Sequence, residues 1–490
     1  MQGLRLHRGN GCLLGLQLPR YDRRSCVCAQ DKLQRMRDHI RLLINGREHT
    51  VRGRDIFTTL SNYLRYDVGA TGTKVVCEEG DCGACTVLIR YSRDEELLPV
   101  NSCIQSLFQL DGASIVTVEG LKHDGQLTPV QESMVACHGA QCGYCTPGFI
   151  MAMSALFEKC DRVDAQQTRE GLVGNLCRCT GYEPIIKAAL EVDGASAPKL
   201  RERYPDVLDV RDSVRVGDFF APATLAEAIA FRKESNATIV QGGTDVGVWI
   251  NKRNYRAPAM LSLAKIESLK ELREEDDAIV AGANVTLSQL EAFVRDRIPE
   301  LYKILSIFGS PQIKNVGTLV GNIANGSPIG DTLPYLLVAD ASLEINGGER
   351  SVPINSFYIG YKKFDLAPDE IITRVRVPIV RDTLRLYKVS RRRDLDISAF
   401  TAAIRLSMAG SQIAKAWIAY GGVAPTVVRL PRTEEFLAGK AMSLDVFKHA
   451  GRIARDEVKP ISDVRGSADY RSQLAENVMA KFAHEMIHPV

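Results

Sequence analysis

Residues 77–85 read Cys77-Glu-Glu-Gly-Asp-Cys82-Gly-Ala-Cys85, and a fourth cysteine follows at Cys103. This C-x4-C-x2-C spacing with a distant fourth cysteine is the plant-type pattern for a [2Fe–2S] cluster. Three thiolates on one loop must converge on two irons, and Gly80 and Gly83 let the backbone fold closely enough. A zinc site is the alternative, but zinc knuckles prefer two paired C-x2-C hooks and this stretch has one. The spacing therefore predicts a ferredoxin-type iron–sulfur loop.

A second group of cysteines occurs in Gln141-Cys142-Gly-Tyr-Cys145-Thr-Pro-Gly and in Gly174-Asn-Leu-Cys177-Arg-Cys179-Thr-Gly. By spacing alone, C-x2-C with C-x-C is ambiguous between Zn²⁺ and [2Fe–2S]. Both hooks lie at the starts of predicted helices, where unpaired N–H groups and the helix dipole favour thiolates. Beside a ferredoxin loop, a second redox centre is the more economical interpretation, and two clusters in series would form an electron path.

The other cysteines have no clear pattern. They are Cys12, Cys26, Cys28, Cys137 and Cys160. Cys160 ends an apolar helical stretch and is expected to be buried, whereas Cys137 lies near the second group but out of register with its hooks. Thirteen cysteines in a chain without a secretion signal indicate metal or redox chemistry in a reducing compartment, which predicts a cytoplasmic protein.

Length and charge limit the possible partners. A chain of 490 residues predicts about three domains. The net charge of +3 implies no nucleic-acid partner, and no apolar run approaches the ~20 residues of a membrane span. Residues 1–35 are basic, with seven Lys and Arg against two Asp. We interpret this head as disordered or as an overlong start, with true initiation at Met36.

Hydrophobic patterns predict an α+β chain. Residues 40–53 read as a hairpin around Asn45-Gly46, residues 56–66 as a helix, and Cys103 is placed on a following helix. Helices are expected in 149–157 and from Asp164 and Tyr182, after which 194–205 reads as a linker. Mixed α/β structure is expected from about 214, and a last α+β unit begins near 384 and ends in a helix from about 472.

The stretch Ile239-Val-Gln-Gly-Gly-Thr-Asp-Val246 reads as a strand that runs into a glycine turn. Adjacent glycines permit a pyrophosphate to approach the backbone closely. The stretch is not G-x-G-x-x-G, and the chain has no P-loop motif. By itself it is a weak signal, since a plain tight turn explains it equally well.

Five motifs together identify a family resemblance. They are CEEGDCGACTV, QCGYCTPGF, GNLCRCTGY, QGGTDVG and VGNIANGSPIGD, beginning at positions 77, 141, 174, 241 and 320. From about residue 38 onward the chain resembles the small subunits of bacterial xanthine dehydrogenases, which belong to the molybdenum hydroxylase family. The resemblance implies a β-grasp plant-type ferredoxin domain, a four-helix [2Fe–2S] domain, an α/β FAD-binding domain and a C-terminal α+β flavoprotein domain.

With these domains the chain divides as follows: an N-terminal extension (1–37), the ferredoxin domain (38–120), the helical [2Fe–2S] domain (121–195), a linker (196–213), the FAD-binding domain (214–383) and the CO-dehydrogenase-flavoprotein-like domain (384–490).

The resemblance also implies cofactor contacts. One cluster is expected on Cys77, Cys82, Cys85 and Cys103, and the other on Cys142, Cys145, Cys177 and Cys179. Asp331 is the expected partner of the FAD ribityl chain. The full set of implied FAD contacts is Ile239, Val240, Gln241, Gly242, Gly243, Thr244, Asp245, Val246, Phe308, Thr318, Leu319, Val320, Gly321, Asn322, Asp331, Ile372 and Lys388.

Partners and activity follow from the same resemblance. Gln141 and Cys179 are expected to face a molybdopterin in a separate large subunit, within a heterotetramer of two small and two large subunits. Electrons from hypoxanthine or xanthine would pass through both clusters and FAD to NAD⁺, and no side chain of this chain is expected to be catalytic. Arg391–Asp396 either helps to govern NAD⁺ access or is simply a solvated charged loop.

Three alternatives remain open. The same chain could serve another molybdenum hydroxylase that acts on an aldehyde or an N-heterocycle, or it could be a stand-alone iron–sulfur flavoprotein that oxidises NADH. A zinc-stabilised binding module would be colourless.

The stretch His484-Glu485-Met-Ile-His488 matches H-E-x-x-H, a metalloprotease helix motif. A zincin requires a third ligand further along and a surrounding cleft, and the sequence after His488 offers neither. Histidines near a helix C-terminus interact favourably with the helix dipole, which is a sufficient explanation.

Overall fold

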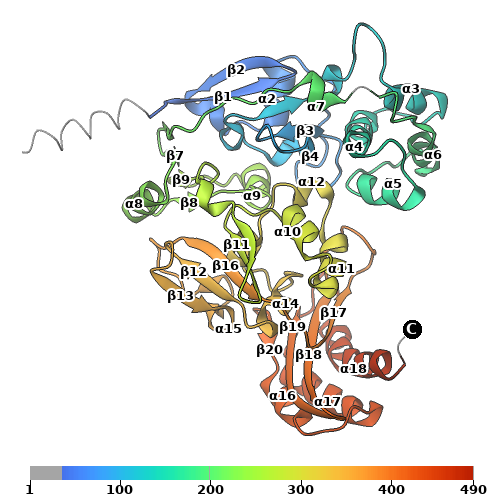
Figure 1. Cartoon of the computed structure of the whole chain (residues 1–490), viewed down its shortest axis with the longest axis vertical. Helices are drawn as coiled ribbons and strands as arrows, with labels where there is room; N and C mark the ends of the chain where they lie inside the picture. The colour runs from blue at the N-terminus through green and yellow to red at the C-terminus, as the bar shows by residue number, and fades with distance from the viewer. Residues whose placement is uncertain (1–35, 198, 489–490) are drawn as a thin grey trace, which may run out of the picture. The chain divides into compact units, whose positions relative to one another are not determined.

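The first sheet has five strands in the order β2-β1-β5-β3-β4. The computed structural model describes residues 36–197 and 199–488, and Figure 1 shows the arrangement of their helices and strands. β1 and β5 run parallel, and the other neighbours run antiparallel. Asn45 and Gly46 have φ of 49° and 80°, as a two-residue hairpin turn requires, which confirms the predicted hairpin. The strands are β1 (His39–Ile44), β2 (Arg47–Arg52), β3 (Thr86–Arg90), β4 (Leu98–Asn101) and β5 (Ser114–Val116).

Short helical segments connect these strands. The helix predicted over 56–66 is α2 (Leu60–Tyr66), and a 3-10 turn, η1 (Gly53–Phe57), precedes it. Cys103 lies on a single 3-10 turn, η2 (Ser102–Ile104), and the expectation of a full helix there was wrong. The chain becomes extended again at Gln105, which leaves no room for a longer helix. Two further 3-10 turns are η3 (Leu107–Leu110) and η4 (Val118–Gly120).

Four helices follow, as the sequence predicts. Three begin at strong start signals: Thr128 and Asp164 form capping boxes with the residues three positions later, and Pro147 lies in the first turn of α4. The central helix α4 is buried along most of its length and supplies much of the local core. The helices are α3 (Pro129–Ala136), α4 (Thr146–Lys159), α5 (Ala165–Leu172) and α6 (Glu183–Glu191).

The connection predicted as a linker over 196–213 is packed against the domains before it. It contains a short helix, α7 (Leu200–Arg203). The Glu158 carboxylate accepts the backbone N–H groups of Leu200, at 2.6 Å, and Arg201, at 3.2 Å. The Tyr204 hydroxyl then donates to the Gly120 carbonyl oxygen at 2.8 Å. These bonds hold the connection in place between the cysteine-bearing segments and the next part of the chain.

The segment from residue 214 begins with a four-stranded sheet in the order β6-β7-β9-β8. β7, β9 and β8 run parallel, and α8 begins at a Thr224/Glu227 capping box. The loop between β8 and α9 is the predicted FAD stretch. The elements are β6 (Val214–Val216), β7 (Phe219–Ala221), α8 (Leu225–Ser235), β8 (Thr238–Ile239), α9 (Val246–Arg253) and β9 (Met260–Leu261).

A second, antiparallel sheet in the same segment has the order β10-β11-β16-β12-β13. Its strands are β10 (Leu272–Glu275), β11 (Ala278–Gly282), β12 (Ser342–Ile345), β13 (Arg350–Pro353) and β16 (Ile372–Pro378). A 3-10 turn, η5 (Glu267–Leu269), precedes it, and β14 (Tyr358–Gly360) pairs with β15 (Lys363–Phe364). The helices of this segment that follow α9 are α10 (Leu287–Val294), α11 (Pro299–Phe308), α12 (Pro311–Lys314), α13 (Leu319–Asn325), α14 (Leu333–Val338) and α15 (Ile354–Phe357).

The last segment is an antiparallel sheet in the order β17-β18-β19-β20, against which three helices pack (Figure 1). Phe447 on α17 and Phe482 on α18 stack with ring centroids 5.5 Å apart in its core. The strands are β17 (Thr383–Val389), β18 (Phe400–Ala409), β19 (Gln412–Gly421) and β20 (Val428–Arg429), and the helices are α16 (Pro431–Leu437), α17 (Leu444–Glu457) and α18 (Ala468–Ile487).

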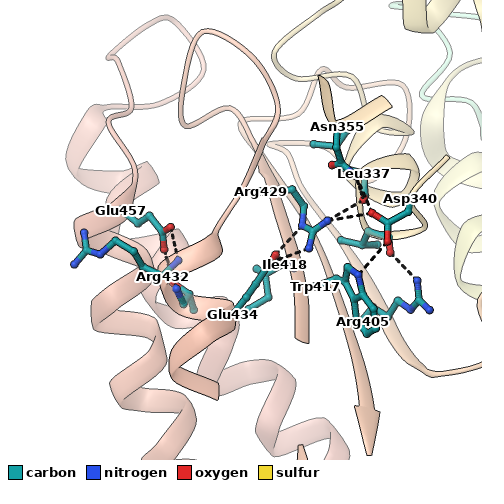
Figure 2. A network of polar contacts seen from close by, with 12 residues as sticks. Leu337, Asp340, Asn355, Arg405, Trp417, Ile418, Arg429, Arg432, Glu434 and Glu457 are labelled. Carbon is teal, nitrogen blue, oxygen red and sulfur yellow. Dashed lines mark hydrogen bonds and ion pairs between the residues drawn. The ribbon is translucent and has the colours of Figure 1, made fainter. Parts of the chain in front are cut away.

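A polar network joins this last segment to the one before it (Figure 2). Asp340, which follows α14, accepts hydrogen bonds from the Trp417 indole at 3.1 Å and the Asn355 amide at 2.8 Å. Arg429 reaches the Leu337 carbonyl oxygen at 3.3 Å and is held by both oxygens of Glu434. The network therefore fixes the sheet of β17–β20 against the end of α14.

A buried charge cluster joins the first sheet to the sheet of β6–β9. Asp111 pairs with Arg37 and with Lys265, each nitrogen 2.6 Å from its Oδ2. Arg37 is the last residue of the predicted N-terminal extension, and residues 1–35 of that extension lie outside the described residues. Lys265 also donates to the Val210 carbonyl oxygen in the connection. One carboxylate thus ties together three stretches that are far apart in the sequence.

Within the described ranges, no helix combines the length and the apolar character that crossing a membrane requires.

We predict that Asp111→Asn lowers the free energy of unfolding by about 3–5 kcal/mol at neutral pH, because it leaves two buried cations without their counter-charge. Burial raises the pKa of Asp111, but the hydrogen bond from Arg37 and the charge of Lys265 outweigh it and hold this pKa below its ordinary value. The carboxylate therefore stabilises the fold above pH ~4, and this stability is lost as the pH falls through the folded-state pKa.

Denaturant unfolding at pH 7 and over the range below pH ~4 measures both effects, because the loss begins only below the unfolded-state pKa. Asp38→Asn is the control, since Asp38 is exposed and pairs with the exposed Arg52, where ~0–1 kcal/mol is expected. Equal losses for the two variants at pH 7 would contradict the role of Asp111.

Candidate metal and cofactor site

The first cysteine group lies between α2 and η2. Cys77, Cys82 and Cys85 lie on the loop that leads into β3, and Cys103 approaches from η2. Cys85 and Cys103 are buried, whereas Cys77 and Cys82 are half-buried. The backbone N–H groups of Glu79 and Cys82 both donate to the Cys77 sulfur at 3.4 Å. The loop therefore brings the four predicted ligands together and directs amide groups at sulfur, as an iron–sulfur site requires.

The four thiols of this group perturb one another. Hydrogen bonds from Cys103 and then from Cys82 lower the pKa of the Cys77 thiol. The same contacts with Cys77 raise the pKa values of Cys82 and Cys103. A hydrogen bond with Cys103 also lowers the pKa of Cys85, so two of the four thiols are shifted toward the thiolate form that binds metal ions.

The second group lies at the start of α4 and before α6. Cys145 is the N-cap residue of α4, Cys177 is buried, and Cys142 and Cys179 are exposed. Burial and then the hydrogen bond with Cys177 raise the pKa of Cys145 to about 12. A hydrogen bond with Cys142 likewise raises the pKa of Cys179. The thiols are therefore in contact as two pairs, Cys145 with Cys177 and Cys142 with Cys179.

This pairing bears on which metal the group fits. Structural zinc needs four ligands around a single ion, whereas a [2Fe–2S] cluster takes two thiolates on each of two irons. Contact in pairs is the arrangement that a two-iron cluster requires.

The two cysteine groups touch through their backbones. The N–H of Leu176, next to Cys177, donates to the carbonyl oxygen of Cys82 at 2.9 Å. The Asn175 amide donates to the Gly83 carbonyl oxygen, also at 2.9 Å, and the Tyr144 hydroxyl donates to the Val75 carbonyl oxygen at 3.2 Å. A single hydrogen bond thus joins Cys82, a predicted ligand in the first group, to the residue next to Cys177, a predicted ligand in the second group.

The first group also touches the predicted FAD stretch. The side-chain amides of Gln105 and Gln109 donate to the carbonyl oxygens of Gly242 and Gln241, both at 2.8 Å. Asn251 on α9 donates to the Cys103 carbonyl oxygen at 2.8 Å. The helix that begins at the FAD stretch therefore packs directly on the turn that carries Cys103.

The FAD stretch has the features of a ligand loop. Gly242 lies against the Val316 carbonyl group so closely that a Cβ at this position would overlap it, and Gly243 has φ of 71°. The Oε1 atom of Gln241 is buried and has no hydrogen-bond partner among the described residues. Asp245 accepts a bond from Asn325 at 3.2 Å, so this loop meets the end of α13. The close approach of Gly242 is internal packing against Val316, whereas the unpaired oxygen of Gln241 fits a bound ligand that donates a hydrogen bond.

The implied contacts over 318–322 form the start of α13, next to this loop. The Thr318 hydroxyl caps the helix by accepting the Gly321 N–H at 3.0 Å. Asn322 accepts the Thr332 hydroxyl at 2.6 Å, which places the helix beside Asp331. Leu319 and Val320 are buried. The structure therefore brings the stretches 239–246, 318–322 and 331 into a continuous set of contacts.

Asp331 and Lys388 form a buried ion pair between the last two segments. The Lys388 Nζ lies 2.5 Å from Oδ2 of Asp331, and the Ser398 hydroxyl donates to Oδ1 at 2.5 Å. Burial raises the pKa of Asp331, and the charge of Lys388 opposes this rise. Lys388 also donates to the Asp396 carbonyl oxygen at 2.9 Å, which ties the 391–396 loop to the pair.

The other two implied FAD contacts come from a helix and a strand of this segment. Phe308 is half-buried at the end of α11, and Ile372 is buried on β16 opposite Ile345.

The charged loop 391–396 is folded back on itself. The Arg392 N–H donates to Asp396 at 2.9 Å, and Arg391 donates to the Val464 carbonyl oxygen at 2.8 Å. Burial, followed by the charge of Cys77, raises the pKa of Asp81, and the charge of Arg392 opposes this rise. The loop is therefore close enough for its charge to act on the first cysteine loop.

The protease-like motif is used for packing. Glu485 accepts the Tyr387 hydroxyl at 2.7 Å and the Lys481 ammonium at 2.5 Å. His484 and His488 meet edge to face with ring centroids 5.0 Å apart. The carboxylate that would have to act as a base is thus engaged in joining α18 to β17.

Of the remaining cysteines, Cys137 donates to Glu191 at 2.9 Å and Cys160 is half-buried at the end of α4. Cys12, Cys26 and Cys28 lie outside the described residues. Gln141 is exposed beside Cys142.

Three family models match the chain. Residues 117–190 match a [2Fe-2S] binding domain, residues 213–380 match the FAD binding domain in molybdopterin dehydrogenase, and residues 385–486 match the CO dehydrogenase flavoprotein C-terminal domain. The second cysteine group and the FAD stretch lie inside the first two of these ranges.

Curated relatives match along most of the chain. Xanthine dehydrogenase 1 of Arabidopsis thaliana is 30% identical over 92% of this chain and 40% of its own length. Xanthine dehydrogenase of Oryza sativa subsp. japonica is 29% identical over 88% of this chain and 38% of its own length. The chain thus spans about two fifths of the length of these relatives.

Solved structures match about half of the chain. A chain of the cyanide-inactivated Cu,Mo-CO dehydrogenase has a TM-score of 0.51 and 27% identity, covering 54% of this chain and 95% of its own. A chain of quinoline 2-oxidoreductase from Pseudomonas putida 86 has a TM-score of 0.51 and 26% identity, covering 55% of this chain and 96% of its own.

We predict that Lys388→Met lowers both the flavin content and the stability of the protein. Removing the cation leaves the Asp331 carboxylate buried without its counter-charge, which destabilises the fold by about 3–5 kcal/mol. The flavin-to-protein absorbance ratio and the thermal transition measure the two effects. Lys448→Met, on the exposed side of α17, is the control. Full flavin content with an unchanged transition would show that the ion pair does not support the flavin site.

Proposed function

We propose that the chain belongs to the molybdenum hydroxylase family and is the electron-transfer subunit of a xanthine dehydrogenase, because it matches a [2Fe-2S] binding domain, the FAD binding domain in molybdopterin dehydrogenase and curated xanthine dehydrogenases. Its partner would oxidise hypoxanthine and xanthine to urate at a molybdopterin. This chain would collect the electrons and deliver them to NAD⁺.

One observation carries this proposal: the two cysteine groups and the FAD stretch are in contact in a fixed order. The second group touches the first through Leu176 and Cys82, and the first touches the FAD stretch through Gln105 and Gln109. Cys142 and Cys179 are exposed, whereas Cys85 and Cys103 are buried on the side of α9. The order implies a direction, from the exposed second group inward to the flavin.

Each cofactor would have its own set of residues. Cys77, Cys82, Cys85 and Cys103, on the sheet that we interpret as a β-grasp ferredoxin fold, would hold one [2Fe–2S] cluster, and Cys142, Cys145, Cys177 and Cys179 would hold the other. The loop 239–246, the start of α13, Asp331 and Lys388 would hold FAD. When bound, the clusters supply one-electron transfer and the flavin converts it into two-electron reduction of NAD⁺.

The side chains of this chain would act by placement and exclusion of water. Gln105 and Gln109 hold the FAD stretch on the turn of Cys103. Lys388 holds the buried Asp331 in position and opposes the rise in its pKa, and the Asp331 side chain would face the ribityl chain. The loop 391–396, tied to Lys388 through the Asp396 carbonyl oxygen, would lie at the entrance for NAD⁺.

The surface around the second group supports a protein partner. Tyr144, Leu176 and Tyr182 are exposed on the loops that carry Cys142, Cys145, Cys177 and Cys179. Exposed aromatic and apolar residues beside exposed thiols are typical of an interface that is covered in the assembly. We propose that a molybdopterin-binding subunit covers them, within a heterotetramer of two copies of each subunit.

Two other functions use the same sites. A partner that acts on an aldehyde or an N-heterocycle would need the same path, as the likeness to quinoline 2-oxidoreductase illustrates. Xanthine dehydrogenases match 88–92% of this chain, so they carry its iron–sulfur and FAD parts in one polypeptide, and this shared organisation supports the xanthine type. A stand-alone NADH oxidoreductase would leave the exposed second group without a purpose.

We predict that Cys142→Ser reduces xanthine-dependent NAD⁺ reduction to background in the assembled enzyme, because it removes a ligand at the entry of the path. NADH oxidation by an artificial dye should continue, since it needs the flavin alone. Cys160→Ser, which alters a cysteine outside both groups, should change neither rate.

Purification with native partners supplies the enzyme for this assay. If Cys142→Ser retained both activities, the proposed order of electron transfer would be wrong. If the unaltered enzyme oxidised an aldehyde or an N-heterocycle but not xanthine, the substrate assignment would be wrong while the path remained.

A further inference from the structure

A buried pair of side-chain amides lies where the three cofactor-bearing parts of the chain meet. Asn175 precedes Cys177 by two positions, and Gln312 lies on α12 in the segment that carries the FAD stretch. The Gln312 Nε2 donates to the Asn175 Oδ1 at 2.8 Å. The exposed fraction is 3% for Asn175 and 0% for Gln312. Neither residue belongs to the implied cofactor contacts.

The pair also binds the first cysteine loop. The Asn175 Nδ2 donates to the Gly83 carbonyl oxygen at 2.9 Å and to the Thr86 hydroxyl at 3.3 Å. Gln312 approaches the same hydroxyl at 3.4 Å. Gly83 lies between Cys82 and Cys85, and Thr86 follows Cys85. Two amides therefore connect the first cysteine loop, the second cysteine loop and the FAD-binding segment.

The surroundings of the pair leave no space for adjustment. A Cβ on Gly83 would overlap the Gly174 carbonyl oxygen, and a Cβ on Gly174 would overlap the Gln312 amide. A Cβ on Gly148, in the first turn of α4, would overlap the Gly83 carbonyl oxygen. Gly83 also has φ of 68°, a backbone conformation that other residues rarely adopt. The backbones of the two loops are thus in direct contact around the amides.

Loss of one amide would leave its partners buried without a hydrogen bond, at a cost of about 1–3 kcal/mol for each group. Separation of the loops would relieve this cost by letting water reach the Gly83 carbonyl oxygen and the Asn175 amide. The backbone bond from Leu176 to Cys82 lies immediately beside these groups, so it would lengthen with them. Electron transfer between two clusters falls steeply as their separation grows.

We propose that Asn175 and Gln312 are positioning residues that set the separation of the two cluster-binding loops and couple it to the FAD-binding segment. The proposal rests on the proposed function, because it requires a cluster on each cysteine group. Gln312 lies 133 positions after Cys179 in the sequence and contributes no ligand to either cluster. The proposal nevertheless gives it control over the distance between the two cluster-binding loops.

The test uses Gln312→Met in the full-length holoenzyme, since methionine keeps the length of the side chain and removes its hydrogen bonds. Gln289→Met is the matched control: Gln289 lies in the same segment and forms the capping box of α10, and its hydrogen bonds go to Thr286 rather than to a cysteine loop. Iron content and the EPR signal of each reduced cluster report on the individual sites. The magnetic splitting between the two reduced clusters reports on their separation.

Gln312→Met should keep its iron and both cluster signals but lose or narrow the splitting, and electron transfer between the clusters should slow by up to ~100-fold, as ångström-scale misplacement allows. Gln289→Met should lose stability alone. An unchanged splitting in Gln312→Met would overturn the proposal. A wild-type enzyme with only one cluster signal would instead overturn the proposed function.

Asn175→Asp is the second variant. It keeps the acceptor for Gln312 but replaces the donor to Gly83 with a charged oxygen that repels the carbonyl group. The same change in the splitting supports the proposal. If neither variant yielded folded protein while Gln289→Met did, the pair would be a folding requirement, and a role in setting the separation would be contradicted.

Discussion

The backbone hydrogen bond from the Leu176 N–H to the Cys82 carbonyl oxygen joins the two cysteine loops without any intervening side chain. This contact requires glycine at the crossing, because a Cβ on Gly83 would overlap the opposite backbone. The first sheet and the four helices must therefore dock in one orientation. The packed connection over 196–213 and the Asp111 charge cluster then hold the next segment against both.

The flavin side of the protein depends on a different kind of contact. Asp331 and Lys388 come from separate segments and meet as a buried ion pair, which is favourable only if the two segments are held in register. The network around Asp340 and Arg429 holds the same two segments together at a second place, away from this ion pair. Polar contacts outside the proposed cofactor sites thus hold the polar groups of those sites in position, as the placement of redox cofactors requires.

Much of this arrangement could be predicted from local sequence. The hairpin at Asn45-Gly46, the helices expected in 149–157 and from Asp164 and Tyr182, and the spacing of Cys77, Cys82 and Cys85 are local signals, and the structure has the corresponding elements. The contacts of Gln105, Gln109 and Gln312 could not be predicted, because each glutamine meets a partner more than 130 positions away and carries no local pattern. The turn that carries Cys103 was mistaken for a helix, since three residues are too few for a periodic signal. The bonds that hold the predicted linker in place could not be predicted either, because they go to distant groups.

The central claim is that two [2Fe–2S] clusters and one FAD lie in series in this chain. Metal, sulfide and flavin analysis of the purified protein, combined with EPR of the reduced state, tests it most directly. The account predicts two iron atoms and two labile sulfides for each cysteine group, one FAD, and two EPR signals that split each other. Zinc in place of iron at either cysteine group, or two signals with no mutual splitting, would contradict it.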